Sequence, residues 1–177
     1  MLPRTINLFK QAKSKEENSV NNLLLSNQHK IRLGLDRVNK AIKNLNLNTE
    51  YPLTNICTIN GTSGKNSIIQ ILKSILIKHK KKYAAFYSPH LMSIVERLEH
   101  NKKFIKLALL KKILLKVHNQ KNLTQFEKLT IAFGLFIKNL KLDWVYGEFG
   151  LFGRKDSVRA LFPNPDLHII SPISFDH

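Results

Sequence analysis

Cysteine, glycine and acidic residues are scarce in this chain of 177 residues. A single cysteine, Cys57, excludes a disulfide framework and is typical of a reducing compartment. No apolar run is long enough to cross a bilayer, and the first residues lack the apolar core of a secretory signal. We therefore expect a cytoplasmic protein with no membrane partner. Hydrophobic residues make up 43% of the chain, enough for one domain with a buried core.

Negative charge is also scarce. Twelve acidic residues face 29 lysines and arginines, which gives a net charge of +17. Such a charge suggests a nucleic-acid partner. The lysines are nevertheless spread along the chain, and the high content of Lys, Asn and Ile with little Gly and Ala is typical of an AT-rich genome. Compositional drift is our preferred interpretation, and nucleic-acid binding is the alternative. The densest lysine runs lie at 78–82, 102–103, 111–112 and 138–141.

The strongest chemical signal lies at residues 59–67, which read Ile-Asn-Gly-Thr-Ser-Gly-Lys-Asn-Ser. A β-prone apolar run precedes this segment and an amphipathic run follows it. Strand, glycine turn, lysine, hydroxyl and helix is the order that cradles nucleotide phosphates. Glycines let backbone N–H groups face anionic oxygens, and the helix N-terminus adds partial positive charge. Lys65 is placed to reach the β- and γ-phosphates, and the Ser67 hydroxyl to bind Mg²⁺.

The spacing of the glycines departs from the full Walker A pattern. Gly61 lies three residues before Gly64, and no glycine lies five residues before it. Short turns of this kind also arise by chance. An ordinary strand-to-helix turn with a solvated Lys65 is therefore the alternative to a phosphate cradle.

Hydrophobic spacing along the rest of the chain predicts an α/β fold with a P-loop-type, mostly parallel sheet flanked by helices. Strand, helix and strand within the segment 55–87 form a βαβ crossover, which makes parallel sheets. Ligand sites are expected at the carboxyl ends of such strands. We expect an N-terminal arm or helix over 1–30, helices over 31–46, 68–76, 107–118 and 124–140, and strands over 55–59, 82–87, 143–149 and 167–171.

The helix expected over 124–140 begins with a capping box, because Thr124 is followed three residues later by Glu127. Glu127 is therefore expected to cap this helix rather than to act in catalysis. Cys57 lies inside an expected strand and should be a buried thiol. Trp144 and a stripe of aromatic residues should lie in the core rather than form a stacking platform. The stripe consists of Phe126, Phe133 and Phe136.

Further motifs accompany the cradle in a fixed order. They are Leu35-Asp36-Arg37, Tyr87-Ser88-Pro89-His90-Leu91 with Glu96-Arg97-Leu98, the run Thr-Gln-Phe-Glu-Lys-Leu-Thr at 124–130, Glu-Phe-Gly-Leu-Phe-Gly-Arg-Lys-Asp at 148–156, and Ser-Phe-Asp-His at 174–177. Over residues 31–177 the chain resembles the folylpolyglutamate synthase and dihydrofolate synthase branch of the Mur ligases. The matching family motifs are Gly-Thr-Asn-Gly-Lys-Gly-Ser, Ser-Pro-His-Leu with Glu-Arg-Ile, Thr-x-Phe-Glu-x-Leu-Thr, Glu-Val-Gly-Leu-Gly-Gly-Arg-Leu-Asp and Gly-Leu-Asp-His.

This resemblance implies a partial ATP-binding domain, the incomplete central domain of a Mur ligase, over residues 31–177. It also implies an ATP-dependent ligase with ATP and Mg²⁺ as cofactors. The family phosphorylates the carboxylate of dihydropteroate or a folate, and the amino group of L-glutamate then attacks the acyl phosphate to form an amide. A carboxylate is a poor electrophile until phosphate makes its oxygen a leaving group. Magnesium and a lysine can offset the charge that builds up.

The resemblance also implies roles for individual residues. Lys65 holds the γ-phosphate as the catalytic residue, Ser67 and Glu148 bind the magnesium at the phosphates, and His177 helps to hold a second magnesium. The nucleotide-binding set is Gly61, Thr62, Ser63, Gly64, Lys65, Asn66 and Ser67. The pterin-side substrate set is Ser88, Pro89, His90 and Arg97.

Each role has a plainer alternative. Glu148 could cap a helix or pair with one of the many lysines, and His177 is a chain terminus, where disorder is common. The Ser-Pro-His segment at 88–90 could be only a turn that ends a strand. Arg97 could be one more solvated cation.

Four substitutions and the length depart from the family pattern. Asn66 and Phe152 replace glycines, and Asn66 would be strained if its position required positive φ. The other two departures are Ser63 and Arg159, each of which replaces an asparagine. The glutamate-binding C-terminal domain has no counterpart in the sequence. Two alternatives follow: an inactive remnant or half of a split enzyme that needs a downstream fragment, and a basic nucleic-acid-binding protein on a P-loop scaffold.

Overall fold

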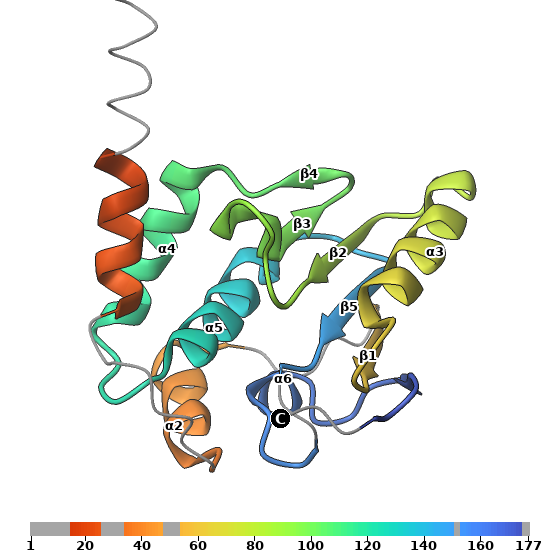
Figure 1. Ribbon diagram of the computed structural model, residues 1–177. Coiled ribbons are helices and arrows are strands. Elements are labelled where there is room, and N and C mark those ends of the chain that lie inside the picture. Colours follow the sequence, from red (N-terminus) through yellow and green to blue (C-terminus); the bar gives the residue numbers. More distant parts are fainter. Residues whose placement is uncertain (1–14, 26–33, 48–53, 151–152, 175–177) are drawn as a thin grey trace, which may run out of the picture.

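A six-stranded sheet forms the middle layer of the molecule, shown in Figure 1 as a computed structural model. The structure describes residues 15–25, 34–47, 54–150 and 153–174. The order of the strands in the sheet is β4-β3-β2-β5-β1-β6. Their bounds are β1 (Asn55–Asn60), β2 (Tyr83–Phe86), β3 (Leu98–His100), β4 (Lys103–Phe104), β5 (Trp144–Glu148) and β6 (Leu167–Ile170).

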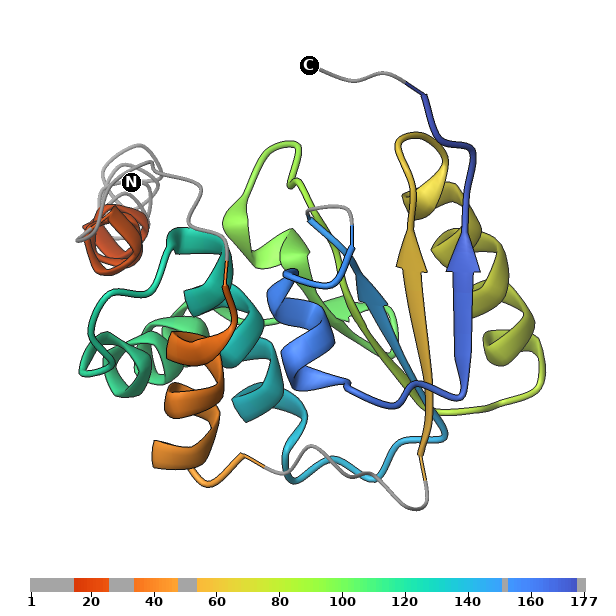
Figure 2. The same ribbon diagram turned by 90° about the horizontal axis from the view of Figure 1, so that it is seen from below.

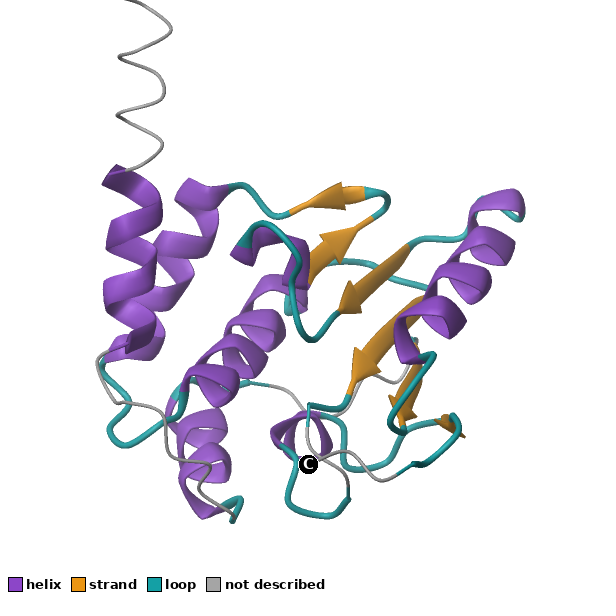
Figure 3. Ribbon diagram, viewed as in Figure 1, coloured by secondary structure: helices purple, strands orange, loops and turns teal. Residues whose placement is uncertain are grey.

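Strands β1, β2, β5 and β6 run parallel to one another, whereas β3 and β4 form an antiparallel hairpin at the β2 side. The parallel strands place their carboxyl ends at one edge of the sheet. Helices connect them (Figure 3). These are α2 (Asp36–Asn44), α3 (Lys65–Lys78), α4 (Leu107–His118), α5 (Gln125–Ile137), α6 (Ser157–Leu161) and a 3-10 helix (Ile94–Arg97), and residues 15–25 are also helical.

The two faces of the sheet are covered unequally. Helix α3 packs on one face, against β1, β2 and β5, while α5 packs on the other with α2, α4 and α6 around it (Figures 1 and 2). The larger hydrophobic core lies on the α5 face and includes the fully buried Phe86, Phe133 and Val145. The smaller one lies under α3, around Cys57 and Tyr146. The buried Cys57 confirms the sequence prediction.

The predicted α/β class with a mostly parallel sheet is confirmed. Helix 107–118 has the predicted bounds, and the ends of the predicted strands shift by at most one residue. The helix predicted over 31–46 is shorter: α2 begins at Asp36, after Gly34 takes a positive φ of 120°, and 31–33 lie outside the described residues. The β3–β4 hairpin was not predicted, because strands of three and two residues carry no clear alternation of apolar and polar side chains.

The capping box at the start of α5 forms as predicted, and it also joins two of the sequence motifs. Thr124 Oγ1 accepts from the backbone N–H of Glu127, and a Glu127 carboxylate oxygen accepts from the N–H of Thr124. The same carboxylate receives two hydrogen bonds from Arg37 on α2, at 2.6 and 3.0 Å. Glu127 therefore fixes α2 against α5. Phe133 is fully buried, and Phe126 and Phe136 pack against the same core.

The β6 edge of the sheet is partly exposed. Within the described residues β6 pairs only with β1, and its apolar side chains Leu167 and Ile170 are 42% and 58% exposed. On α3, Ile71 and Ile75 are also exposed. In the described part of the chain, no helix is both long and apolar enough to cross a membrane.

Candidate nucleotide and metal site

The predicted site residues gather at the carboxyl ends of β1, β2 and β5. The loop at 61–64 follows β1, Ser88 follows β2, and Glu148 ends β5 directly beside Ile59 of β1. The topology therefore assembles one site from segments almost 90 residues apart in sequence. This is the edge at which parallel sheets bind ligands.

Two glycines shape the loop at 61–64. Gly61 has φ +125°, and a Cβ at this position would collide with the Ser171 side chain and backbone. Gly64 has φ +83°, a left-handed conformation that costs glycine little, and it precedes the first residue of α3. Asn66 lies inside α3 and is not among the described residues with positive φ, so the expected strain at this substitution is absent.

The segment after β6 anchors the first half of this loop, a contact that the sequence did not reveal. The Pro172 carbonyl accepts hydrogen bonds from the N–H groups of Thr62, at 3.0 Å, and of Ser63, at 3.4 Å. The hydroxyl of Thr62 also bonds to the Ser174 backbone. The backbone N–H groups in the first turn of α3 have no acceptor within their own helix. They are therefore the donors suited to an anion at this site.

Lys65 lies in the first turn of α3 and reaches back over the loop. Its Nζ donates to the carbonyls of Gly61, at 2.7 Å, and Thr62, at 3.2 Å. It also lies 4.0 Å from a carboxylate oxygen of Glu148. Ser67 lies in the same turn and is exposed. The first turn of α3 thus places Lys65 near Glu148 and leaves the Ser67 side chain exposed to solvent.

Glu148 is a buried carboxylate, only 2% exposed. Burial raises its pKa above the ordinary value, while a hydrogen bond from the Ser88 N–H, at 2.9 Å, and the charges of Lys65 and Arg97 act in the opposite direction. The net shift is upward, so the negative charge is incompletely compensated. A divalent cation at this carboxylate would supply the missing compensation.

The residues predicted for the substrate side lie in the loop between β2 and β3, where the backbone N–H of Ser88 donates to Glu148. Arg97 Nε donates to His90 Nδ1 at 2.9 Å, and a second Arg97 nitrogen donates to Ser88 Oγ at 3.3 Å. Arg97 is therefore not a solvated cation. Burial and the nearby guanidinium lower the pKa of His90, which suits its role as an acceptor. Pro89 is exposed between these partners.

Glu96 fixes the conformation of this loop. Its carboxylate accepts hydrogen bonds from three successive backbone N–H groups, at 2.8 to 3.1 Å, and these bonds lower its pKa. The donors are Leu91, Met92 and Ser93. The segment that follows β2 is thus held at both ends, by the Ser88 N–H on Glu148 and by the Glu96 carboxylate on residues 91–93.

Next to this loop lies a buried polar network that sequence reasoning missed. The Glu99 carboxylate on β3 accepts hydrogen bonds from Tyr83 at 2.6 Å, Tyr87 at 2.8 Å and Lys73 at 2.9 Å. Burial alone would raise the pKa of Glu99, but these hydrogen bonds outweigh it and the net shift is downward. Only the fold brings Lys73 and Glu99, 26 positions apart, together.

The described residues fit a magnesium site with few protein ligands. They contain no cluster of three or more histidine, cysteine, aspartate or glutamate side chains suited to hold a metal ion. Magnesium is commonly bound by one or two carboxylates together with substrate phosphates and water. Glu148 beside the loop meets that minimum, with the Ser67 hydroxyl in the adjacent helix turn. His177 and Phe152 lie outside the described residues.

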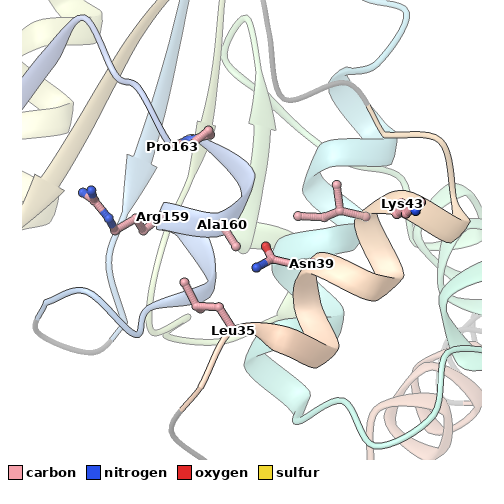
Figure 4. Close-up of a pocket in the computed structure, with 7 residues that line it drawn as sticks. Leu35, Asn39, Lys43, Arg159, Ala160 and Pro163 are labelled. Carbon is pink, nitrogen blue, oxygen red and sulfur yellow. The ribbon is translucent and has the colours of Figure 1, made fainter.

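A cavity of about 360 Å³ lies between α2 and α6 (Figure 4). Arg159 stands where the resembling family has an asparagine. In Figure 4 its side chain extends from α6 away from α2, so it does not fill the cavity between the two helices. The cavity is lined by Leu35, Asn39, Ile42, Lys43, Arg159, Ala160 and Pro163.

Comparison with known proteins identifies relatives of one kind, although no protein-family model matches the sequence. The chain is 30% identical over 157 residues to the dihydrofolate synthase/folylpolyglutamate synthase of Haemophilus influenzae, covering 83% of this chain and 33% of that protein. It is 32% identical over 154 residues to the dihydrofolate synthetase of Saccharomyces cerevisiae, covering 83% and 35%.

Solved structures give the same result. Escherichia coli FolC in complex with DHPP and ADP matches with a TM-score of 0.81 at 27% identity, over 92% of this chain and 39% of that one. The bifunctional synthase of Yersinia pestis complexed with AMPPNP and Mn matches with a TM-score of 0.80 at 28% identity, over the same shares. The chain spans little more than a third of the length of these relatives. It is a homologue of the dihydrofolate synthase/folylpolyglutamate synthase family that corresponds to the N-terminal and central part of its members.

Proposed function

We propose that this chain is the ATP- and magnesium-binding part of a ligase that joins L-glutamate to dihydropteroate or a folate through an acyl phosphate. The observation that carries the proposal is the pair Lys65 and Glu148, 4.0 Å apart. Lys65 begins the helix that follows β1, and the buried Glu148 ends the adjacent parallel strand β5. The related synthase bound to AMPPNP and Mn supports this assignment of the ligands.

Within this proposal the first turn of α3 binds the β- and γ-phosphates. Lys65 would exchange its contacts with the carbonyls of Gly61 and Thr62 for phosphate oxygens. Bound magnesium offsets the charge of the transferring phosphoryl group. Glu148 and Ser67 would hold that ion, and His177 is a proposed ligand of a second magnesium.

The loop at 88–97 takes the substrate side. Arg97 carries a positive charge next to Glu148, and His90 and Ser88 fix its orientation. This arrangement suits an acidic substrate whose carboxylate must approach the phosphate. Because the chain spans about a third of its relatives' length, we propose nucleotide and metal binding for these residues, and ligation only together with further protein that packs against the exposed β6 side.

The test is magnesium-dependent binding of a non-hydrolysable ATP analogue, measured by calorimetry. Lys65→Ala should weaken the affinity roughly 10- to 100-fold, because an ammonium–phosphate contact is lost. Glu148→Gln should leave binding without metal intact and remove the gain that magnesium gives. The matched control is Lys40→Ala, which removes an exposed lysine of α2.

Equal weakening in Lys65→Ala and Lys40→Ala would reduce the binding to general charge attraction and overturn the cradle. A magnesium effect that survives Glu148→Gln would remove this carboxylate from the metal site while leaving the cradle in place.

A further inference from the structure

Two of the lysine runs that are separate in sequence come together in the fold. Lys80, Lys81 and Lys82 form the turn from α3 into β2, and Lys102 lies in the β3–β4 turn. All four line one pocket of about 230 Å³, with Ile77, Tyr83 and Asn101. We call this the lysine pocket. The apparent scatter of lysines along the sequence thus conceals a local concentration of positive charge.

The lysine pocket lies at the end of the sheet opposite the nucleotide site. Helix α3 has 14 residues, with the loop at 61–64 before its first turn and the lysine pocket after its last. At about 1.5 Å per residue the two ends lie roughly 20 Å apart. Figure 1 shows the end of α3 and the β3–β4 turn at the same side of the molecule. One small ligand therefore cannot occupy both sites.

Positive charge in the lysine pocket is only partly neutralised. Asp143 lies 3.2 Å from Lys81 and accepts a hydrogen bond from the Lys82 backbone. In the described part of the chain, the ammonium groups of Lys80, Lys82 and Lys102 take part in none of the ion pairs.

The charge at the end of helix α3 explains the positions of some of these lysines but not of all. Lysines after the last turn of α3 complement the partial negative charge of a helix C-terminus. That accounts for Lys80 and Lys81, but Lys102 belongs to a different turn. Lys80 and Lys102 also take left-handed conformations, with φ of +55° and +68°, which favour glycine. Lysine thus occupies two positions at which glycine would have less backbone strain and would add no positive charge.

We propose that the lysine pocket is a second anion site, which binds one phosphate group of a phosphate polymer while its flanking lysines contact the neighbouring phosphates. The pocket is below the size of sites that enclose whole small molecules, so it suits a single group rather than an entire nucleotide. Lysine ammonium groups bind phosphate as mobile point charges and need no planar geometry. A free polyphosphate chain and a nucleic-acid backbone share this chemistry.

The test uses a pocket variant that should fold at least as well as the parent. Lys80→Gly combined with Lys102→Gly removes two charges and also relieves two left-handed lysines, so its melting temperature should not fall. The matched control is Lys112→Gln combined with Lys116→Gln, which removes the same charge from exposed positions of α4. Both pairs are introduced in a Lys65→Ala background, so that the nucleotide loop does not contribute.

Calorimetric titration with inorganic tripolyphosphate and with a single-stranded RNA oligonucleotide, at about 50 and 200 mM salt, gives the readout. We expect saturable binding that weakens about tenfold or more in the pocket variant and less than about twofold in the control. Tighter binding of tripolyphosphate assigns the site to free polyphosphate, and tighter binding of RNA assigns it to a nucleic-acid backbone. Equal losses in the two variants, or no saturable binding of either probe, would overturn the proposal.

Discussion

Two buried glutamates on the same side of the sheet face lysines from the same helix, yet they differ in how close the lysine comes and in how many hydrogen-bond donors surround them. Glu99 on β3 and Glu148 on β5 are each 2% exposed. Lys73 of α3 reaches Glu99 at 2.9 Å, whereas Lys65, two turns earlier in α3, stays 4.0 Å from Glu148. Two tyrosine hydroxyls complete the shell of Glu99, while Glu148 receives one backbone N–H, that of Ser88.

The difference separates a structural carboxylate from one suited to a ligand. A buried charge with a full set of donors is held in its ionised form, and the pKa of Glu99 is accordingly lowered. A buried charge with few donors is costly, and the pKa of Glu148 is raised. Glu148 carries this cost at the carboxyl end of a parallel strand, where a bound cation would remove it. Each of the following substitutions alters one side of this contrast.

The largest effect is expected from Glu99→Gln. The change leaves the Lys73 ammonium, 16% exposed, without a counter-ion and offers two tyrosine donors a single carbonyl oxygen. We expect the free energy of unfolding to fall by about 3 kcal/mol, measured by urea denaturation at pH 7. Because the folded-state pKa of Glu99 is lowered, this contribution exists above the ordinary glutamate pKa and disappears as the pH falls through the folded value.

The control for this prediction is an exposed ion pair. Lys81→Met removes a partner of Asp143, with side chains 54% and 37% exposed, and should change the free energy of unfolding by less than about 1 kcal/mol. If Glu99→Gln cost no more than this control, the network around Glu99 would not be what holds α3 to the β2–β3 pair.

Local patterns in the sequence predicted one of these two carboxylates. Glu148 stands at the end of an apolar run, so its strand and its position could be predicted from neighbouring residues, while its proposed role came from the family resemblance of the motif around it. The glycine loop before α3 and the capping box of α5 were predictable for the same reason. Each depends on residues within a few positions of one another.

Long-range partners could not be predicted in this way. Nothing near Glu99 in sequence indicates Lys73, and nothing near Thr62 indicates that Pro172, 110 positions later, anchors it. Arg37 and Glu127 were found in separate motifs, and only the packing of α2 on α5 makes them a pair. These contacts follow from the order of strands in the sheet, which no single segment determines.

A smaller loss of stability is expected from Tyr83→Phe. The Tyr83 hydroxyl donates to Glu99 and also accepts from the Lys102 backbone N–H at 3.0 Å, so its removal affects two groups. We expect a loss of about 2 kcal/mol in the free energy of unfolding. Tyr87→Phe is the matched control. The Tyr87 hydroxyl donates to Glu99 at 2.8 Å and accepts from Lys73 at 3.4 Å, but Lys73 keeps its shorter bonds to Glu99, so this change should cost less. The reverse ranking would mean that the Lys102 amide does not depend on Tyr83.

The smallest effect, and the only one of opposite sign, is expected from Glu148→Gln. Replacing an incompletely compensated buried charge by a neutral amide of the same shape should raise the free energy of unfolding at pH 7 by about 1 kcal/mol, a size common among single stabilising substitutions. The pH dependence gives the sign. The folded-state pKa of Glu148 is raised, so the parent protein loses stability as the pH rises from the ordinary glutamate pKa through the folded value. The variant lacks this loss, so its advantage should vanish at low pH and be complete above the folded pKa.

Added magnesium should raise the melting temperature of the parent and leave that of the variant unchanged, because the ion and the substitution remove the same uncompensated charge. A destabilising Glu148→Gln would place Glu148 with Glu99 as a structural carboxylate, and would remove the reason for proposing a metal at this end of β5.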